Sequence, residues 1–311
     1  MDTVITTPPF IGRKDILLTA GLSVGYLMLS YLLIGYKPEQ LFLVVLFNGL
    51  YYASRATRRF IVGFSVFIIY WIIFDYMKAF PNYRYNAVHI GSLYNFDKKL
   101  FGIYSGGQLL SVNEFLLAHQ SAWMDVAAGL FYLCWVPVPL AFAGWLFYKD
   151  RKQFVYFSST FLLVNLIGFA FYYIYPAAPP WYVQQYGFAF RAGTPGNTAG
   201  LSRFDAFFHT SIFKGLYAKS SNVFAAMPSL HSAYPVITLY YAIKSRMKMA
   251  GILFGIVMLG IWTSAVYTSH HYVSDVMAGI ICAIGTIIIF NAFVVNRKWF
   301  NSYLNIISKK I

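Results

Sequence analysis

Apolar runs as long as a membrane span recur along this 311-residue chain and constrain its fold more than any other feature. Hydrophobic residues make up 59% of the chain and charged residues only 11%. A soluble domain carries about 25% charged residues, so this chain has too little charge to cover a globule in water. The apolar runs and the many aromatic residues also exclude intrinsic disorder. The composition therefore indicates a protein that folds in a lipid bilayer.

Eight stretches have the composition of membrane-spanning helices, although the second is short. They cover residues 16–36, 40–54, 60–79, 122–148, 153–175, 226–243, 249–268 and 273–295. We therefore expect an all-α polytopic membrane protein with about eight transmembrane helices. Charges and glycines interrupt residues 80–121, which favours helices lying on the membrane surface. Residues 176–221 are rich in Pro, Gly, Asn and Ser and are expected to form a long ordered loop.

The distribution of basic residues predicts the orientation in the membrane. Eight spans place both termini on one side, and 15 of the 24 Lys and Arg residues lie on that side in short loops and tails. These are Arg13, Lys14, Arg55, Arg58, Arg59, Lys149, Arg151, Lys152, Lys244, Arg246, Lys248, Arg297, Lys298, Lys309 and Lys310. The positive-inside rule therefore predicts cytoplasmic termini, with 80–121 and 176–221 facing the periplasm, exterior or lumen. No basic patch on a soluble domain is visible, so the net charge of +14 indicates anionic lipid rather than nucleic acid.

Three polar motifs lie at span ends on the predicted outer side. They are FDYMK at 74–78, MPSLHS at 227–232 and SHHYVSD at 269–275. Ionisable residues at membrane depth are costly, so each is a functional-site hypothesis by default. Because the corresponding spans start or end on the same surface, we expect the three motifs to converge there.

His271 and Asp275 lie four residues apart at a predicted helix start and should share one face. A carboxylate that accepts one ring N–H of a histidine fixes its tautomer and leaves the other nitrogen as a nucleophile or base. In MPSLHS, Pro228 suits the first helical turn, so Ser229 and His231 would lie at a helix N-terminus, which favours phosphate. Two histidines and a carboxylate around an anion site suggest phosphoryl transfer through a phosphohistidine.

Other interpretations of these residues stay open. The three histidines of the two motifs and Asp275 also fit hydrogen bonding to surface loops, or a zinc site, for which the spacing is a weak signal. Asp75 and Lys78 fit a structural ion pair at a helix end as well as a contact with a lipid headgroup. A transporter or channel would carry polar residues through several helix centres, whereas here they gather near one surface.

The motifs resemble those of the type-2 phosphatidic acid phosphatase superfamily. PSLHS and HYVSD are similar to its second and third motifs, which read PSGH and SRxxxxxHxxxD. Ser264, His271 and Asp275 stand at the expected Ser, His and Asp. Leu230 replaces the glycine, Ala265 replaces the arginine, and no KxxxxxxRP first motif is present. These departures point away from the ordinary phosphatase branch.

The resemblance is closer to the inositol phosphorylceramide synthases, the aureobasidin-sensitive enzymes of fungi and their prokaryotic relatives. The similar stretches include PAAPPWY, AGLSRFD, FAAMPSLHS and SHHYVSD, in the same order and spacing. The similarity covers roughly residues 70–302. It implies a six-helix catalytic membrane core over 60–311, preceded by two additional N-terminal transmembrane helices in 1–59.

The resemblance also implies roles for individual residues. His271 would attack the donor lipid phosphate, with Asp275 orienting it. His231 would protonate the departing diacylglycerol oxygen and then activate the acceptor hydroxyl. The phosphate would sit on Ser229 and backbone N–H groups, with Arg203 replacing the missing arginines or, equally, serving as a solvated loop charge. Asp75 and Lys78 remain candidate substrate contacts. Neither a metal nor another cofactor is required.

The implied function is transfer of phosphoinositol from phosphatidylinositol to a ceramide or dihydroceramide hydroxyl, with release of diacylglycerol. A lipid phosphate phosphatase of the same fold is the first alternative, because its catalytic residues would be the same. A transporter or channel is the second. The expected partners are the two lipid substrates and the bilayer, and an accessory subunit is left open.

Overall fold

Helices make up nearly all of the secondary structure in the computed structural model, which describes residues 11–219 and 222–311. Within those ranges the only sheet is a two-stranded antiparallel hairpin. Residues 1–10 of the predicted N-terminal segment and residues 220–221 of the predicted outer loop lie outside the described part. The predicted all-α class is confirmed.

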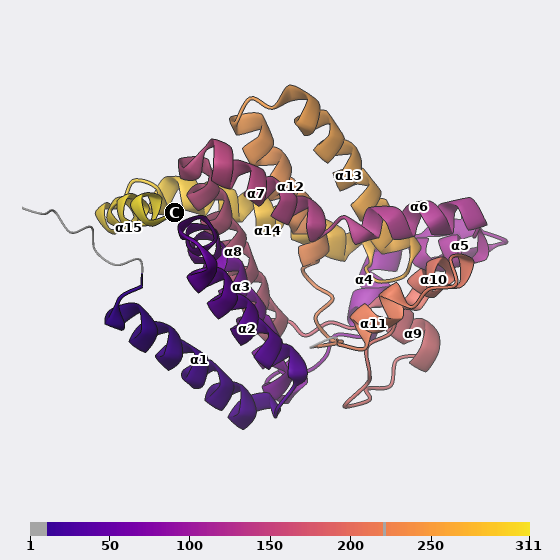
Figure 1. The fold of residues 1–311 in the computed structure, drawn as a ribbon. Coiled ribbons are helices and arrows are strands. Elements are labelled where there is room, and N and C mark those ends of the chain that lie inside the picture. The colour runs from indigo at the N-terminus through magenta and orange to yellow at the C-terminus, as the bar shows by residue number, and fades with distance from the viewer. Residues whose placement is uncertain (1–10, 220–221) are drawn as a thin grey trace, which may run out of the picture.

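The longer helices form the bundle that Figure 1 shows. They are α1 (Arg13–Ile34), α2 (Pro38–Ala53), α3 (Arg55–Tyr76), α6 (Ala122–Leu133), α7 (Pro137–Lys149), α8 (Arg151–Ile174), α12 (Leu230–Lys244), α13 (Lys248–Tyr267), α14 (Val273–Ile289) and α15 (Lys298–Lys310). The shorter elements are α4 (Gly91–Phe101), β1 (Ile103–Ser105), β2 (Gln108–Leu110), α5 (Val112–Ala118), α9 (Pro180–Tyr186), α10 (Ser202–Phe207) and α11 (Ile212–Tyr217). Helix α15 was not among the predicted elements.

Six helical stretches of the described residues are long and apolar enough to cross a membrane. They are Arg13–Ile34, Arg55–Ala79, Ala122–Lys149, Arg151–Ile174, Lys248–Tyr267 and Val273–Val294. The protein is therefore an integral, multi-pass membrane protein, as predicted. Helices α2 and α12 have only 16 and 15 residues, so the total of eight spans stays a prediction.

Helix α12 is central to the bundle, where it packs against α7, α8, α13 and α14 (Figure 1). Its side chains Ala233, Ile237 and Tyr241 are fully buried. The helix begins at Leu230 rather than at the predicted residue 226, because Ser229 caps its N-terminus. A helix of this length rises roughly 22 Å, less than the hydrocarbon thickness of about 30 Å. The burial of its side chains shows that the neighbouring helices shield much of α12 from lipid.

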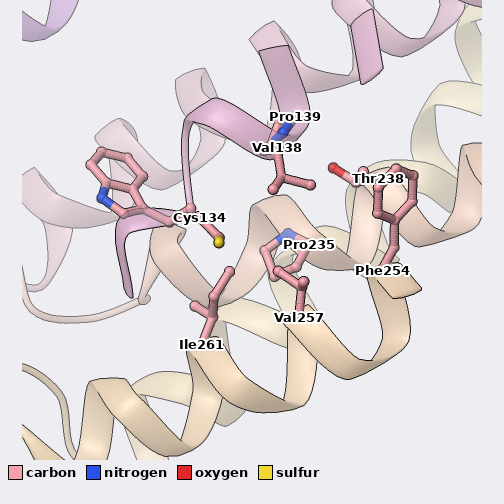
Figure 2. Close-up of a pocket in the computed structure, with 9 residues that line it drawn as sticks. Cys134, Val138, Pro139, Pro235, Thr238, Phe254, Val257 and Ile261 are labelled. Carbon is pink, nitrogen blue, oxygen red and sulfur yellow. The ribbon is translucent and has the colours of Figure 1, made fainter. Parts of the chain in front are cut away.

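The predicted span 122–148 is divided into α6 and α7 by a break at residues 134–136. Pro137 and Pro139 explain the break, because proline lacks an N–H and is tolerated only in the first turn of a helix. A small apolar pocket lies beside it, and Figure 2 shows Pro139 of α7, Pro235 of α12 and Ile261 of α13 around this pocket. The interruption thus lies next to the first half of α12.

A polar stripe on α1 holds the N-terminal helix to α2 and α3. Along this stripe, Tyr51 donates to Asp15 at 2.9 Å, Thr19 bonds Tyr52, Asn48 donates to Ser23 at 2.9 Å, and Ser30 lies 2.8 Å from the hydroxyl of Tyr76. Hydrogen bonds of this kind drive helix association in lipid, where apolar surface gains little from being buried. The remaining faces of α1 are apolar and exposed, as expected for contact with lipid.

The described parts of the two segments predicted to lie outside the bundle, residues 80–121 and 176–219, cover one of its ends. Figure 1 places α4, α5, α9, α10 and α11 together, away from α15 and the C-terminus. Isolated bridges join His89 to Ala177 and Ala177 to Ala225, which ties residues near 89, 177 and 225 side by side. These segments therefore form one layer over the starts of α12 and α14.

Gly279 lies where α14 crosses the start of α12, and a methyl group there would overlap the carbonyl oxygen of Ser229. We expect Gly279→Ala to destabilise the protein by about 1–3 kcal/mol, because a backbone carbonyl cannot rotate away from the added carbon. The measurement is the midpoint of thermal unfolding in detergent micelles. Gly285→Ala on the same helix is the matched control, since its added carbon would meet no atom within 4 Å. Equal midpoints for the two variants would contradict the prediction.

Candidate active site

His231 and His271 come from different helices and meet at the covered end of the bundle. His231 is the second residue of α12, and His271 lies in the turn between α13 and α14. Nδ1 of His231 is 3.1 Å from Nε2 of His271, which is hydrogen-bond distance. One nitrogen of such a pair carries a proton and the other a lone pair. The two rings are therefore arranged for proton transfer and nucleophilic attack within one small space.

Asp275 stands behind His271, on the side away from His231. Its Oδ2 lies 3.6 Å from Nδ1 of His271, an ion-pair separation that is longer than a hydrogen bond. The same oxygen accepts the backbone N–H of Tyr272 at 2.9 Å. His271 precedes α14 instead of sharing its face, because the helix begins at Val273 and Asp275 lies in its first turn. The proximity expected from the spacing arises through this capping arrangement.

Ser229 joins the start of α12 to the start of α14. Its side chain is fully buried and accepts from the N–H of Ser232 as the helix cap, while the hydroxyl of Ser232 donates to it at 3.1 Å. Its own N–H donates to the carbonyl of Asp275 at 3.0 Å. The Ser229 hydroxyl is thus engaged in capping α12, two residues before His231 in the chain.

Arg203 of α10 lies in an ion pair and is not a solvated loop charge. Its Nε donates to Asp125 at 2.6 Å, and the hydroxyl of Tyr267 donates to the same carboxylate oxygen at 2.8 Å. Nη2 of Arg203 is buried and has no hydrogen-bond partner among residues 11–219 and 222–311. The guanidinium therefore keeps hydrogen-bonding capacity for a further acceptor.

Asp75 and Lys78 bond to each other at the end of α3, three residues apart. The hydrogen bonds and ion pairs found for them do not include His231 or His271. This geometry matches the alternative that they form a structural ion pair, and a contact with substrate stays a prediction.

His270 connects the outer layer to the turn that carries His271. Its ring stacks on Tyr217 with centroids 4.5 Å apart, and its Nε2 lies 3.0 Å from the carbonyl oxygen of Thr198. Burial and the neighbouring His271 lower the pKa of His270 to about 3. His270 is therefore neutral near pH 7 and donates its Nε2–H to Thr198.

Two aromatic side chains beside the histidines were not predicted. The ring centroid of Trp135 lies 4.4 Å from that of His231, and the ring centroid of Tyr132 lies 5.2 Å from it. Both residues come from the region where α6 ends and the chain breaks before α7. Their sequence reads as an apolar span, so only the proline pair at 137 and 139 signals that the helix is interrupted there.

The part of the chain that the structure describes contains no group of three or more His, Cys, Asp or Glu side chains placed to hold a metal ion. The groups that the structure brings together are two imidazoles, one buried carboxylate and the first turn of α12, whereas the interactions of Arg203 are with Asp125 and Tyr267.

Comparison with known proteins identifies relatives over most of the chain. The PAP2 superfamily model matches residues 93–289. A phosphoinositol dihydroceramide synthase of Bacteroides thetaiotaomicron is 45% identical over 274 residues, covering 88% of this chain and 90% of that protein. No solved structure matches the chain significantly.

Two fungal relatives match a smaller share of their own length. The inositol phosphorylceramide synthase catalytic subunits of Schizosaccharomyces pombe and Saccharomyces cerevisiae are 29% and 26% identical. The matches cover 71% and 75% of this chain but only 51% and 57% of those proteins. The protein is an enzyme that belongs to the PAP2 superfamily and, within it, to the family of the inositol phosphorylceramide synthases.

Proposed function

We propose that the enzyme transfers phosphoinositol from phosphatidylinositol to the hydroxyl of ceramide or dihydroceramide and releases diacylglycerol. The observation that carries this proposal is the 3.1 Å contact between His231 and His271, with Asp275 behind His271. This arrangement supplies a nucleophile and an acid–base group without a metal. The name of the bacterial relative, a phosphoinositol dihydroceramide synthase, supports the choice of substrates.

In the first step, Nε2 of His271 attacks the donor phosphorus and forms a P–N bond. The P–O bond to diacylglycerol breaks, and His231, which enters the step as an imidazolium with protons on both ring nitrogens, donates its Nδ1 proton to the leaving oxygen and becomes neutral. Asp275 faces Nδ1 of His271, which favours the tautomer with its lone pair on Nε2 and stabilises the positive charge that the attack creates. The phosphate enters between the two rings, so their contact opens when the donor binds.

In the second step, His231 accepts the proton of the acceptor hydroxyl as its oxygen attacks phosphorus. The P–N bond breaks and His271 is regenerated. His231 therefore acts as an acid and then as a base, and it returns to its starting state after each turnover. The proton lost from the acceptor replaces the one given to diacylglycerol.

The phosphate oxygens are proposed to lie against the first turn of α12, beside Ser229, with Arg203 approaching from α10. N–H groups in a first helical turn lack an intrahelical acceptor and favour an anion. The unpartnered Nη2 of Arg203 supports this role, while Asp125 holds the rest of the guanidinium.

The active site is proposed to face away from the cytoplasm, with both termini inside. Fifteen of the 24 Lys and Arg residues support this orientation, because they lie at the helix ends opposite the histidines.

Product analysis separates transfer from hydrolysis. With purified enzyme, phosphatidylinositol and ceramide, inositol phosphate should appear on ceramide, with diacylglycerol released in equal amount. Mass spectrometry of the lipid and aqueous phases measures the partition. Soluble inositol phosphate as the main product at saturating ceramide would favour the phosphatase alternative.

Single cysteines test the orientation. Ser202 and Lys248 are both exposed, at the covered and uncovered ends of the bundle respectively. A membrane-impermeant thiol reagent should label Ser202→Cys in intact cells and label Lys248→Cys only after permeabilisation. The unsubstituted protein gives the background from Cys134 and Cys282. The reverse labelling pattern would overturn the orientation.

The histidines and Asp275 should respond differently to substitution. His271→Ala should lose turnover and any covalent adduct, because the attacking nitrogen is gone. Asp275→Asn should keep the imidazole of His271 but lower kcat by up to about 10⁴-fold. Removing the orienting carboxylate of a protease triad has an effect of this size. His231→Ala should lose least with a nitrophenyl phosphodiester donor, whose leaving group departs without a proton.

Rapid quenching with a donor labelled in its phosphate locates the adduct. We expect an acid-labile, base-stable label on His271. Recovery of the label on His231, or turnover by His271→Ala, would contradict the assigned roles.

A further inference from the structure

Helices α4 and α5, on the predicted membrane surface, are joined into one unit by a charged network. The hydroxyl of Tyr94 donates to Glu114 at 2.7 Å, and Nζ of Lys98 donates to that hydroxyl at 2.7 Å. Glu114 also accepts the N–H of Ser111 at 2.7 Å and so caps α5. The hairpin of β1 and β2 connects the two helices along the chain. The unit is therefore held by charge-assisted hydrogen bonds as well as by chain connectivity.

Each helix of this unit sends one fully buried polar side chain to the chain around His271. Asn113 of α5 donates through Nδ2 to the carbonyl of Val266 at 2.8 Å and to the carbonyl of His271 at 3.0 Å. Asp97 of α4 accepts the N–H of Ser274 at 2.8 Å. Val266 and Ser274 lie on either side of His271 in the chain, so the surface unit holds this segment before, at and after His271.

The backbone of His271 is fixed at both of its polar groups. Its N–H donates to the carbonyl of Ala265 at 3.0 Å, and its carbonyl accepts from Asn113. The turn contains Ser269 at a φ of +60°, a conformation that non-glycine residues rarely adopt. Such a turn persists when its surroundings over-determine it. Asn113 is the side chain that closes this turn against the end of α13.

We infer that Asn113 is a positioning residue that holds the His271 peptide so that Nε2 points at His231. The inference rests on the proposed function in that it takes His271 as the nucleophile. Removing Asn113 takes the donor from the buried carbonyl of His271, while the carbonyl of Val266 still accepts the N–H of Ser269 at 3.0 Å. The turn is then free to shift. A displacement of about 1 Å at a reacting group lowers a rate by about 10²-fold.

The chain offers a matched control in Asn82. This side chain is also fully buried and also donates to two backbone carbonyls, of Tyr172 at 2.8 Å and of Phe224 at 2.7 Å. Its bonds do not involve the turn that carries His271. Replacing either asparagine by alanine removes the same chemistry from an equally buried place, so their stability losses should be similar.

The test compares Asn113→Ala with Asn82→Ala at a temperature where both remain folded. Asn113→Ala should lower kcat by about 10- to 100-fold with KM within twofold, because the residue acts on the nucleophile and not on lipid binding. Asn82→Ala should keep kcat within about threefold. Asn113→Ser, which keeps one donor, should lie between wild type and Asn113→Ala, and it serves if the alanine variant does not fold.

A substrate-free measurement keeps this inference separate from the proposed function. Modification by diethyl pyrocarbonate, followed by mass spectrometry, reports how accessible the His271 ring is. The rate at His271 should rise in the Asn113 variants and stay unchanged in Asn82→Ala. Unchanged His271 reactivity, or an equal loss of kcat in both alanine variants, would overturn the positioning role. Failure of wild-type enzyme to transfer phosphoinositol would overturn the proposed function alone.

Discussion

The close contact between the starts of α12 and α14 is the constraint on which the site depends. Ser229 caps α12 and donates its N–H to Asp275, and Gly279 lets the two backbones approach. A larger residue than glycine at this crossing would separate the helices. Because His231 follows Ser229 and His271 precedes Asp275, one backbone contact sets the distance between two rings that lie 40 residues apart in the chain.

The outer layer matters because the turn between α13 and α14 lies outside both helices. Its backbone groups therefore need hydrogen-bond partners from elsewhere in the chain. Segments far away in sequence supply its partners: Trp181 donates to Ser269 at 3.0 Å, Gly200 donates to Thr268 at 2.9 Å, and His270 bonds Thr198. Buried backbone groups must find such partners, since leaving them unpaired is costly. The layer that covers the histidines is thus the same layer that shapes the turn presenting one of them.

Local sequence patterns predicted the all-α membrane fold and the proximity of His271 and Asp275, because these depend on hydrophobic runs and one short spacing. The meeting of His231 and His271 was expected because their spans start or end on the same surface. The start of α12 was misplaced by four residues, since a run of apolar residues does not show where a cap ends it. Asn113 was not predicted. Its partners lie more than 150 residues away, and a short polar side chain in a surface segment gives no local signal of burial. Arg203 was left open between two roles because its partner Asp125 lies on another helix.

The hydrogen bonds along α1 determine how far this helix can slide or rotate against α2 and α3. Asp15, Thr19, Ser23 and Ser30 each meet a different partner, so a slide of one helical turn, about 5.4 Å, would mismatch all of them together. Each bond contributes only about 0.6 kcal/mol in a membrane protein. Jointly they give a helix whose other faces contact lipid one preferred depth and rotation. Apolar packing alone would determine neither the depth nor the rotation, because successive turns of a leucine-rich helix present similar surfaces.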